Sequence, residues 1–324
     1  MREEILKCIG KFPLKSEINL KIVQEMDKGD YIEQLIEYNV EKNERVASYL
    51  LIPKKINNRA PAILAIHQHG GKWDIGKSEV VGLKGDAMFS YGVDLVKMGF
   101  VVLAPDLLCF ESRSSENFNE TREDYKAYER FKFCEYIQYG SSLKAKYIHD
   151  LNVAVDVLES LDYVNENIGV LGHSMGGQES VWITWHDKRI KACVSSCGIG
   201  LYKSIFEKEI LHNFAAYVPG LGQICDMDDI ITQISPKPIL LLSGLGHGHH
   251  FPLEGIKVIE EKNKMNPNFK SVKFDGDHKF DENEKNIAYD FLNDFLKWFK
   301  SKRLGAFFLL KELINGIIKL TNTM

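Results

Sequence analysis

One hexapeptide, Gly172-His173-Ser174-Met175-Gly176-Gly177, constrains the fold of this 324-residue chain more than any other segment. It has the pattern G-x-S-x-G, follows the apolar residues 168–171 and precedes a stretch that is compatible with a helix. A serine at such a strand-to-helix junction sits on a sharp, strained turn, and glycine must flank it to avoid collisions with the nearby backbone. The pattern therefore predicts that Ser174 is an exposed nucleophile.

Two turns are expected to supply the N–H groups of an oxyanion hole. The helix that begins after Ser174 points its first N–H groups at developing negative charge, so we expect the Met175 N–H to be one donor. A second donor should follow the apolar run 61–67, where the sequence reads His67-Gln68-His69-Gly70-Gly71. We predict the His69 N–H in this role, with that of Gln68 as the alternative, and we expect the His67 side chain to be a hydrogen-bonded turn residue.

Short apolar runs that end in turn residues alternate along the chain with helical patterns. The runs predict buried parallel strands at 61–67, 100–104, 168–172, 192–197, 238–243 and 271–274. Helical patterns cover 150–161, the segment after Ser174, and 287–299, where Ile287, Phe291, Phe295 and Trp298 share one face. Alternating strands and helices predict an α/β protein with a mostly parallel central sheet and helices on both faces.

The composition argues against several classes of protein. A chain with 44% hydrophobic and 27% charged residues can bury a large core, and a formal net charge of -4 offers no basic surface for nucleic acid. The six cysteines form no CxxC pair, and residues 1–7 lack the apolar core of a secretion signal. We expect a cytoplasmic protein that needs neither a cofactor nor a metal.

Residues 1–303 are predicted to form one domain with two long insertions. The insertions, at about 111–146 and 198–235, are rich in aromatic residues, and long connections in compact domains are usually lids or binding segments. We therefore expect them to form the walls of an apolar pocket. The remaining residues, 304–324, are predicted to form an amphipathic helix that packs on the chain itself, joins copies of it into a homo-oligomer, or contacts a membrane surface.

A serine hydroxyl needs a general base, and His278 is the best candidate. It lies in a polar turn after the last predicted strand, which suits the chain order serine, acid, histidine. The acid should follow the strand at 238–243, but no carboxylate occurs there before Glu254. Either Ser174 and His278 act as a dyad, or Glu254, Asp277 or Asp281 supplies the acid.

With these residues in hand, the chain resembles the α/β-hydrolase superfamily, and within it the dienelactone-hydrolase-like and acetyl-xylan-esterase-like bacterial hydrolases. The resemblance runs from about Val46 to Phe299 and is carried by 67–71, by Ala104-Pro105-Asp106, by 172–178, by Phe251-Pro252 and by Gly276-Asp277-His278. It implies an esterase triad of Ser174, His278 and an aspartate. The family aspartate usually stands four residues before the proline of Phe-Pro, and Gly248 occupies that position here.

We therefore predict a serine hydrolase that cleaves a small or medium carboxylic ester, lactone or thioester through an acyl-enzyme on Ser174. Three alternatives remain. An acyltransferase would use the same residues. A catalytically degenerate descendant would bind a ligand in the old pocket. A metal-binding protein would use the imidazoles of His247, His249 and His250 together with His67 and His69.

Overall fold

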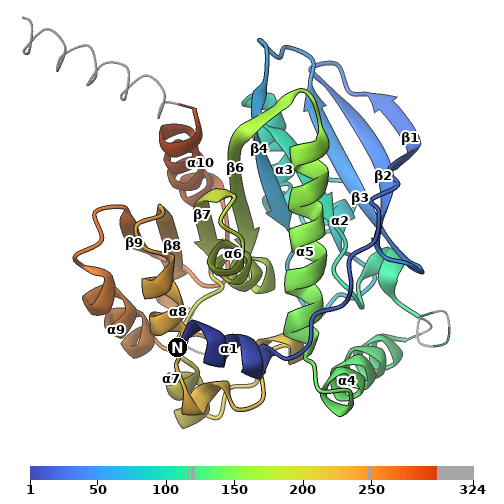
Figure 1. Ribbon diagram of the computed structural model, residues 1–324. Coiled ribbons are helices and arrows are strands. Elements are labelled where there is room, and N and C mark those ends of the chain that lie inside the picture. Colours follow the sequence, from blue (N-terminus) through green and yellow to red (C-terminus); the bar gives the residue numbers. More distant parts are fainter. Residues whose placement is uncertain (116, 118–120, 247–249, 298–324) are drawn as a thin grey trace, which may run out of the picture.

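A nine-stranded sheet forms the centre of the molecule in a computed structural model, which describes residues 1–115, 117, 121–246 and 250–297 (Figure 1). Its order among these residues is β1-β2-β3-β5-β4-β6-β7-β8-β9. The strands are β1 (Lys21–Asp27), β2 (Tyr31–Glu41), β3 (Glu44–Pro53), β4 (Ala60–Ile66), β5 (Val101–Pro105), β6 (Val164–His173), β7 (Ile190–Ser196), β8 (Ile239–Gly244) and β9 (Phe269–Phe274).

The sheet has a parallel part and an antiparallel part. Strands β5, β4, β6, β7, β8 and β9 all pair in parallel. Strands β1, β2 and β3 form an antiparallel ribbon, and β3 joins it to the parallel part by pairing antiparallel with β5. Because the carboxyl ends of all the parallel strands lie at the same end of the sheet, the residues that follow β4, β6, β8 and β9 can meet there.

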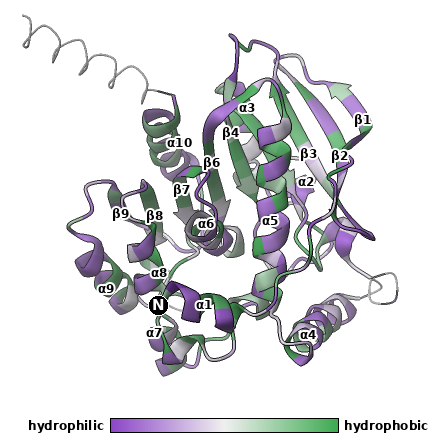
Figure 2. Cartoon of the chain, viewed as in Figure 1, coloured by the Kyte–Doolittle hydropathy of each residue, from purple (hydrophilic) through white to green (hydrophobic). Residues whose placement is uncertain are grey.

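Helices cover both faces of this sheet. One hydrophobic cluster packs α5 (Leu143–Ser160), α6 (Met175–His186) and α8 (Met227–Ile234) on one face, and a second packs α3 (Tyr91–Lys97) and α10 (Glu282–Leu296) on the other. The central strands are the hydrophobic part of the chain, whereas α4 (Arg122–Gln138) is largely hydrophilic (Figure 2). The other helices are α1 (Arg2–Ile9), α2 (Lys77–Val80), α7 (Tyr202–Glu207), α9 (Leu253–Asn263), η1 (Ala87–Phe89), η2 (Glu111–Arg113), η4 (Phe214–Ala216) and η5 (Leu221–Gln223).

All six predicted strands are present as β4 to β9, and their parallel pairing is confirmed. One detail was wrong: 271–274 was predicted to be buried, but β9 is an edge strand that leaves most of its side chains partly or fully exposed. The ribbon β1 to β3 was not predicted. The helix predicted at 287–299 begins earlier, at Glu282. Trp298 and the predicted C-terminal helix, 304–324, lie outside the described residues.

Both predicted insertions lie beyond the end of the sheet at which β6 runs into α6. The first contains η2, α4 and the start of α5, and the second contains α7, η4, η5 and α8. Figure 1 shows α4 and α7 below this end of the sheet, on either side of α1. In the part of the chain that the structure describes, no helix has the length and apolar character required to span a membrane.

A buried ion-pair network ties the antiparallel ribbon to the helical layer. Asp150 of α5 contacts Arg113 at 2.8 Å and Lys146 at 3.0 Å, and Lys146 also contacts Glu41 and Glu44 at the turn between β2 and β3. Burial alone would raise the pKa of Asp150, but the charges of Arg113 and Lys146 outweigh it and hold that pKa well below its usual range. The network is therefore built around the ionised form of Asp150.

We predict that Asp150→Asn lowers the free energy of unfolding by roughly 3–5 kcal/mol, because it removes the more buried of the two carboxylates, Asp150 and Glu44, that contact both Arg113 and Lys146. Because the pKa of Asp150 is lower in the folded than in the unfolded chain, this contribution is present above the unfolded value of 3.8 and is lost as the pH falls further. Urea unfolding at pH 7 measures it. Asp156→Asn, in a partly exposed pair on the same helix, should cost less than about 1 kcal/mol and is the control.

Candidate active site

Ser174 lies at the junction of β6 and α6 in a backbone conformation that side chains rarely adopt. Its φ is 56° and its ψ is -122°. Two backbone hydrogen bonds hold it there: the Ser174 N–H donates to Ser196 O at 2.7 Å, and the Gln178 N–H donates to Ser174 O at 3.0 Å. The Ser174 side chain remains partly exposed although the helix that follows it is buried. This is the strained turn that the sequence motif predicts.

The two flanking glycines of the motif allow α6 to come very close to the sheet. A Cβ on Gly176 would lie 2.1 Å from Ile66 O in β4, and a Cβ on Gly172 would lie 2.3 Å from the Gly176 carbonyl. Neither contact is compatible with a side chain. The glycines therefore set the distance between the start of α6 and the turn that follows β4.

His278 lies beside this junction, in the loop between β9 and α10. Its half-buried imidazole is centred 4.5 Å from the ring of His173, which directly precedes Ser174. His173 is itself buried, and its Nδ1 lies 2.9 Å from Ser196 Oγ. Ser174 and His278 are more than one hundred residues apart in sequence. The structure thus brings them to the same end of the sheet, where the parallel strands have their carboxyl ends.

The loop that follows β8 packs against the loop that carries His278. The Gly246 N–H donates to Gly276 O at 2.8 Å, and the ring of His250 is centred 5.4 Å from that of His278. An acid at the start of this loop would thus lie near the base. Gly248, the position that the sequence comparison with the family singles out, lies outside the described residues, as do His247 and His249.

The three candidate acids have different surroundings. Glu254 is exposed in the first turn of α9, and the Asp277 side chain is exposed next to His278 in the chain. Asp281 accepts a hydrogen bond from Lys279 Nζ at 2.7 Å. Hydrogen bonds with Glu284 and Lys279 lower the pKa of Asp281. Asp281 is therefore ionised but already paired with a cation.

The turn after β4 contains the other candidate oxyanion donors. His67 is buried, donates from Nδ1 to Gln68 O at 2.7 Å and accepts at Nε2 from the Leu107 N–H at 3.1 Å. Burial lowers the pKa of His67, so the ring is a neutral structural group, as expected. Within the described part of the chain, the N–H groups of Gln68, His69 and Met175 donate to no protein acceptor. They can therefore bind a substrate oxygen.

Glu129 of α4 contacts this turn, and the sequence analysis did not predict a role for it. Its buried carboxylate accepts hydrogen bonds from His69 Nε2 at 3.0 Å and from Trp73 Nε1 at 2.8 Å. It also accepts from the Phe214 N–H, in the second insertion, at 3.3 Å. Nothing in the sequence around Glu129 distinguishes it from the other acidic residues of α4.

An apolar pocket of about 310 Å³ lies between the two insertions, where the sequence analysis expected pocket walls. The hydroxyl of Tyr202, which lines it, accepts a hydrogen bond from Gln178 Nε2 at 3.3 Å, one turn of α6 after Ser174. Neither Ser174 nor His278 is among the described residues that line this pocket, and its link to the serine runs through α6. The lining residues are Phe133 from the first insertion and Tyr202, Phe206, Ala216, Tyr217, Val218, Pro219, Leu221 and Gly222 from the second.

A family comparison agrees with this geometry. A profile of the dienelactone hydrolase family matches residues 46–304. The chain belongs to the dienelactone hydrolase family. A relative from Bacillus subtilis strain 168, provisionally named the hydrolase YtaP, is 29% identical to this chain over 265 residues. The match covers 81% of this chain and 85% of that protein. Family membership supports hydrolase activity on esters.

Solved structures of esterases share the fold of this dienelactone hydrolase family member. A Bacteroides fragilis protein provisionally named an acetyl xylan esterase has a TM-score of 0.67 at 17% identity, over 96% of this chain and 86% of that one. The glucuronoyl esterase of Solibacter usitatus has a TM-score of 0.63 at 14% identity, over 90% and 91% of the two chains. At these identities the likeness establishes the α/β-hydrolase fold alone.

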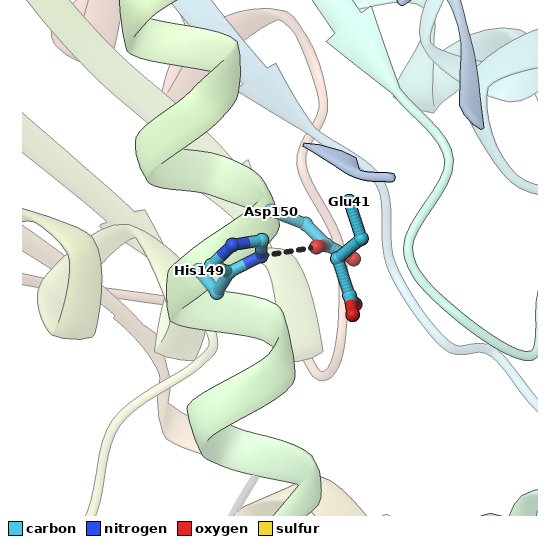
Figure 3. A group of neighbouring side chains, drawn as sticks. All are labelled: Glu41, His149 and Asp150. Carbon is cyan, nitrogen blue, oxygen red and sulfur yellow. Dashed lines mark hydrogen bonds and ion pairs between the residues drawn. The ribbon is translucent and has the colours of Figure 1, made fainter. Parts of the chain in front are cut away.

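One group of side chains in this family member has the spacing of metal ligands. Glu41, His149 and Asp150 place ligand atoms within 4.8 Å of one another (Figure 3). The ammonium of Lys146 contacts both carboxylates, and His149 Nδ1 is hydrogen-bonded to Asp150 at 2.9 Å. The group is therefore part of the ion-pair network, with a lysine at the position that a cation would take. Of the five histidines in the predicted cluster, His247 and His249 lie outside the described residues.

We predict that Gly176→Ala lowers the free energy of unfolding by about 3 kcal/mol and abolishes hydrolysis, since its methyl group would overlap the backbone of β4. Gly222→Ala is the matched control, because a Cβ there meets no atom within 4 Å, and its cost should stay within about 0.5 kcal/mol. Urea unfolding compares the two. Equal stability of both variants would contradict the close approach of α6 and β4.

Proposed function

We propose that this protein hydrolyses a carboxylic ester by a serine mechanism, with Ser174 as the nucleophile and His278 as the general base. The single observation that carries the proposal is the strained Ser174 turn, which exposes a hydroxyl next to the loop of His278. A serine at positive φ is costly to maintain and is retained where the exposed hydroxyl is needed. Membership of a family of ester hydrolases supports the same conclusion.

The reaction would proceed through an acyl-enzyme. His278 removes the proton from Ser174 Oγ as the oxygen attacks the ester carbonyl, and the protonated imidazole then donates this proton to the departing alkoxide. The Met175 N–H and that of His69 or Gln68 stabilise the tetrahedral oxyanion. Water, deprotonated by His278, attacks the acyl-enzyme and releases the carboxylic acid. Lactones and thioesters would follow the same steps.

The pocket supports an ester with an apolar portion. Its walls are hydrophobic, and four of the nine lining residues are aromatic, so they would favour an alkyl or aryl group over a sugar. Two structural relatives are named for acetyl xylan and glucuronoyl esters, but the residues that line this pocket offer few polar groups to a sugar. We therefore propose a small or medium apolar ester as the substrate.

We predict that the chain hydrolyses p-nitrophenyl butyrate and that Ser174→Ala and His278→Ala each lower kcat/KM by at least about 10³-fold, since nucleophile and base act as one unit. Labelling of Ser174 by a fluorophosphonate provides an independent check. An active wild type together with an unimpaired Ser174→Ala variant would refute the mechanism. If only Gly248→Asp is active, the chain is a degenerate hydrolase whose acid has been lost.

We also predict that the wild type prefers butyrate to acetate esters and that Phe133→Ala reduces this preference about 10-fold, because it removes an apolar wall from the pocket. The ratio of the two kcat/KM values measures the effect and cancels any loss of active protein. Phe131→Ala is the control, since Phe131 is exposed on the same helix. A ratio that falls equally in both variants would count against this pocket as the substrate site.

A further inference from the structure

We propose that Glu129 is a positioning residue that holds the oxyanion turn, residues 67–71, in its working conformation. This inference rests on the proposed function, because it concerns the N–H groups of Gln68 and His69. Glu129 lies on α4 and does not carry any of the chemistry itself. It acts through the imidazole of His69.

Glu129 contacts three residues from two separate segments of the chain. The carboxylate accepts from His69 Nε2 in the turn, from Trp73 Nε1 just after it, and from the Phe214 N–H in the second insertion. All three partners are N–H donors, and the residue is only 1% exposed. His69 and Trp73 donate to one carboxylate oxygen, and the Phe214 N–H donates to the other. An amide could keep the first two bonds only as weaker, uncharged ones, and it would turn its NH2 group toward the Phe214 N–H.

The hydrogen bond to Glu129 fixes which nitrogen of His69 carries the proton. His69 Nε2 donates to the carboxylate, which leaves Nδ1 free to accept from the Gly71 N–H at 3.0 Å. The ring is also packed edge-on against Trp73 and Phe110, at 4.9 and 5.1 Å. The side chain of His69 thus folds back on its own turn and holds it.

The turn needs such an external constraint. Gly70 and Gly71 both adopt positive φ values, 53° and 65°, and glycine has more conformational freedom than any other residue. The bond from the Gly71 N–H to His69 Nδ1 spans this flexible pair. An error of about 1 Å in the position of an oxyanion donor costs on the order of 10² in rate, so the constraint matters for kcat.

Glu129 also connects the turn to the apolar pocket. Phe133 lies one helical turn further along α4 and lines the pocket, and its ring is centred 5.3 Å from that of Phe214. The backbone of Phe214 in turn donates to Glu129. The same carboxylate therefore joins the pocket wall, built from both insertions, to the oxyanion turn.

The test compares Glu129→Gln with Glu135→Gln, a control on the same helix whose carboxylate pairs with Lys132 near the surface. We expect Glu129→Gln to lower kcat for p-nitrophenyl butyrate by about 10²-fold with KM changed less than about threefold, and Glu135→Gln to change neither. Long-range ¹H–¹⁵N NMR of labelled histidine should show the His69 proton moving from Nε2 towards Nδ1 in Glu129→Gln alone. A purely structural role would not produce this tautomer shift.

A second variant keeps the proposal testable if Glu129→Gln does not fold. His69→Leu removes both the donor to Glu129 and the acceptor for the Gly71 N–H, so it should lower kcat to a similar extent. Unchanged kcat in a folded Glu129→Gln or in His69→Leu, with an active wild type, would overturn the inference and leave the proposed function intact. If the wild type has no Ser174-dependent activity, the proposed function fails, and an unshifted tautomer would overturn the positioning role separately.

Discussion

The approach of α6 to strand β4 at Gly176 is the contact on which the rest of the site depends. A single Cβ at this position would lie 2.1 Å from a backbone oxygen, so the helix can begin where it does only because the residue is glycine. This contact brings the Met175 N–H and the turn after β4 to the same place. Ser174, immediately before α6, has a positive φ that costs of order 1–3 kcal/mol, which the packing of α6 must offset.

The second insertion and α4 complete a site that the sheet alone leaves open. The sheet supplies the ends of β4, β6, β8 and β9, but the turn after β4 contains two consecutive glycines at positive φ. Glu129 constrains this turn by accepting hydrogen bonds from His69 before the two glycines and from Trp73 after them. It also accepts a hydrogen bond from the Phe214 N–H. The insertions therefore line the pocket and also contact the turn that follows β4.

The sequence predicted the features that depend on local pattern and missed those that depend on tertiary contact. Strands β4 to β9 appear as apolar runs because most of them are buried on both faces, whereas β1 is exposed at every residue and gives no such signal. The nucleophile motif is contained in six residues. Glu129, by contrast, meets partners 56, 60 and 85 residues away, and no spacing rule relates them. Only the packing of both insertions makes Glu129 identifiable.

Electrostatics distinguishes the carboxylates that could act as the acid partner of His278. His278 would carry a positive charge in the transition state, and a neighbouring negative charge stabilises that charge. The rings nearest to it include those of His173 and His250, and imidazoles supply no negative charge. Asp281 is paired with Lys279, which cancels much of its field. Among the three candidate acids, the lysine partner of Asp281 therefore weakens its field at His278, whereas Glu254 and Asp277 are exposed to solvent.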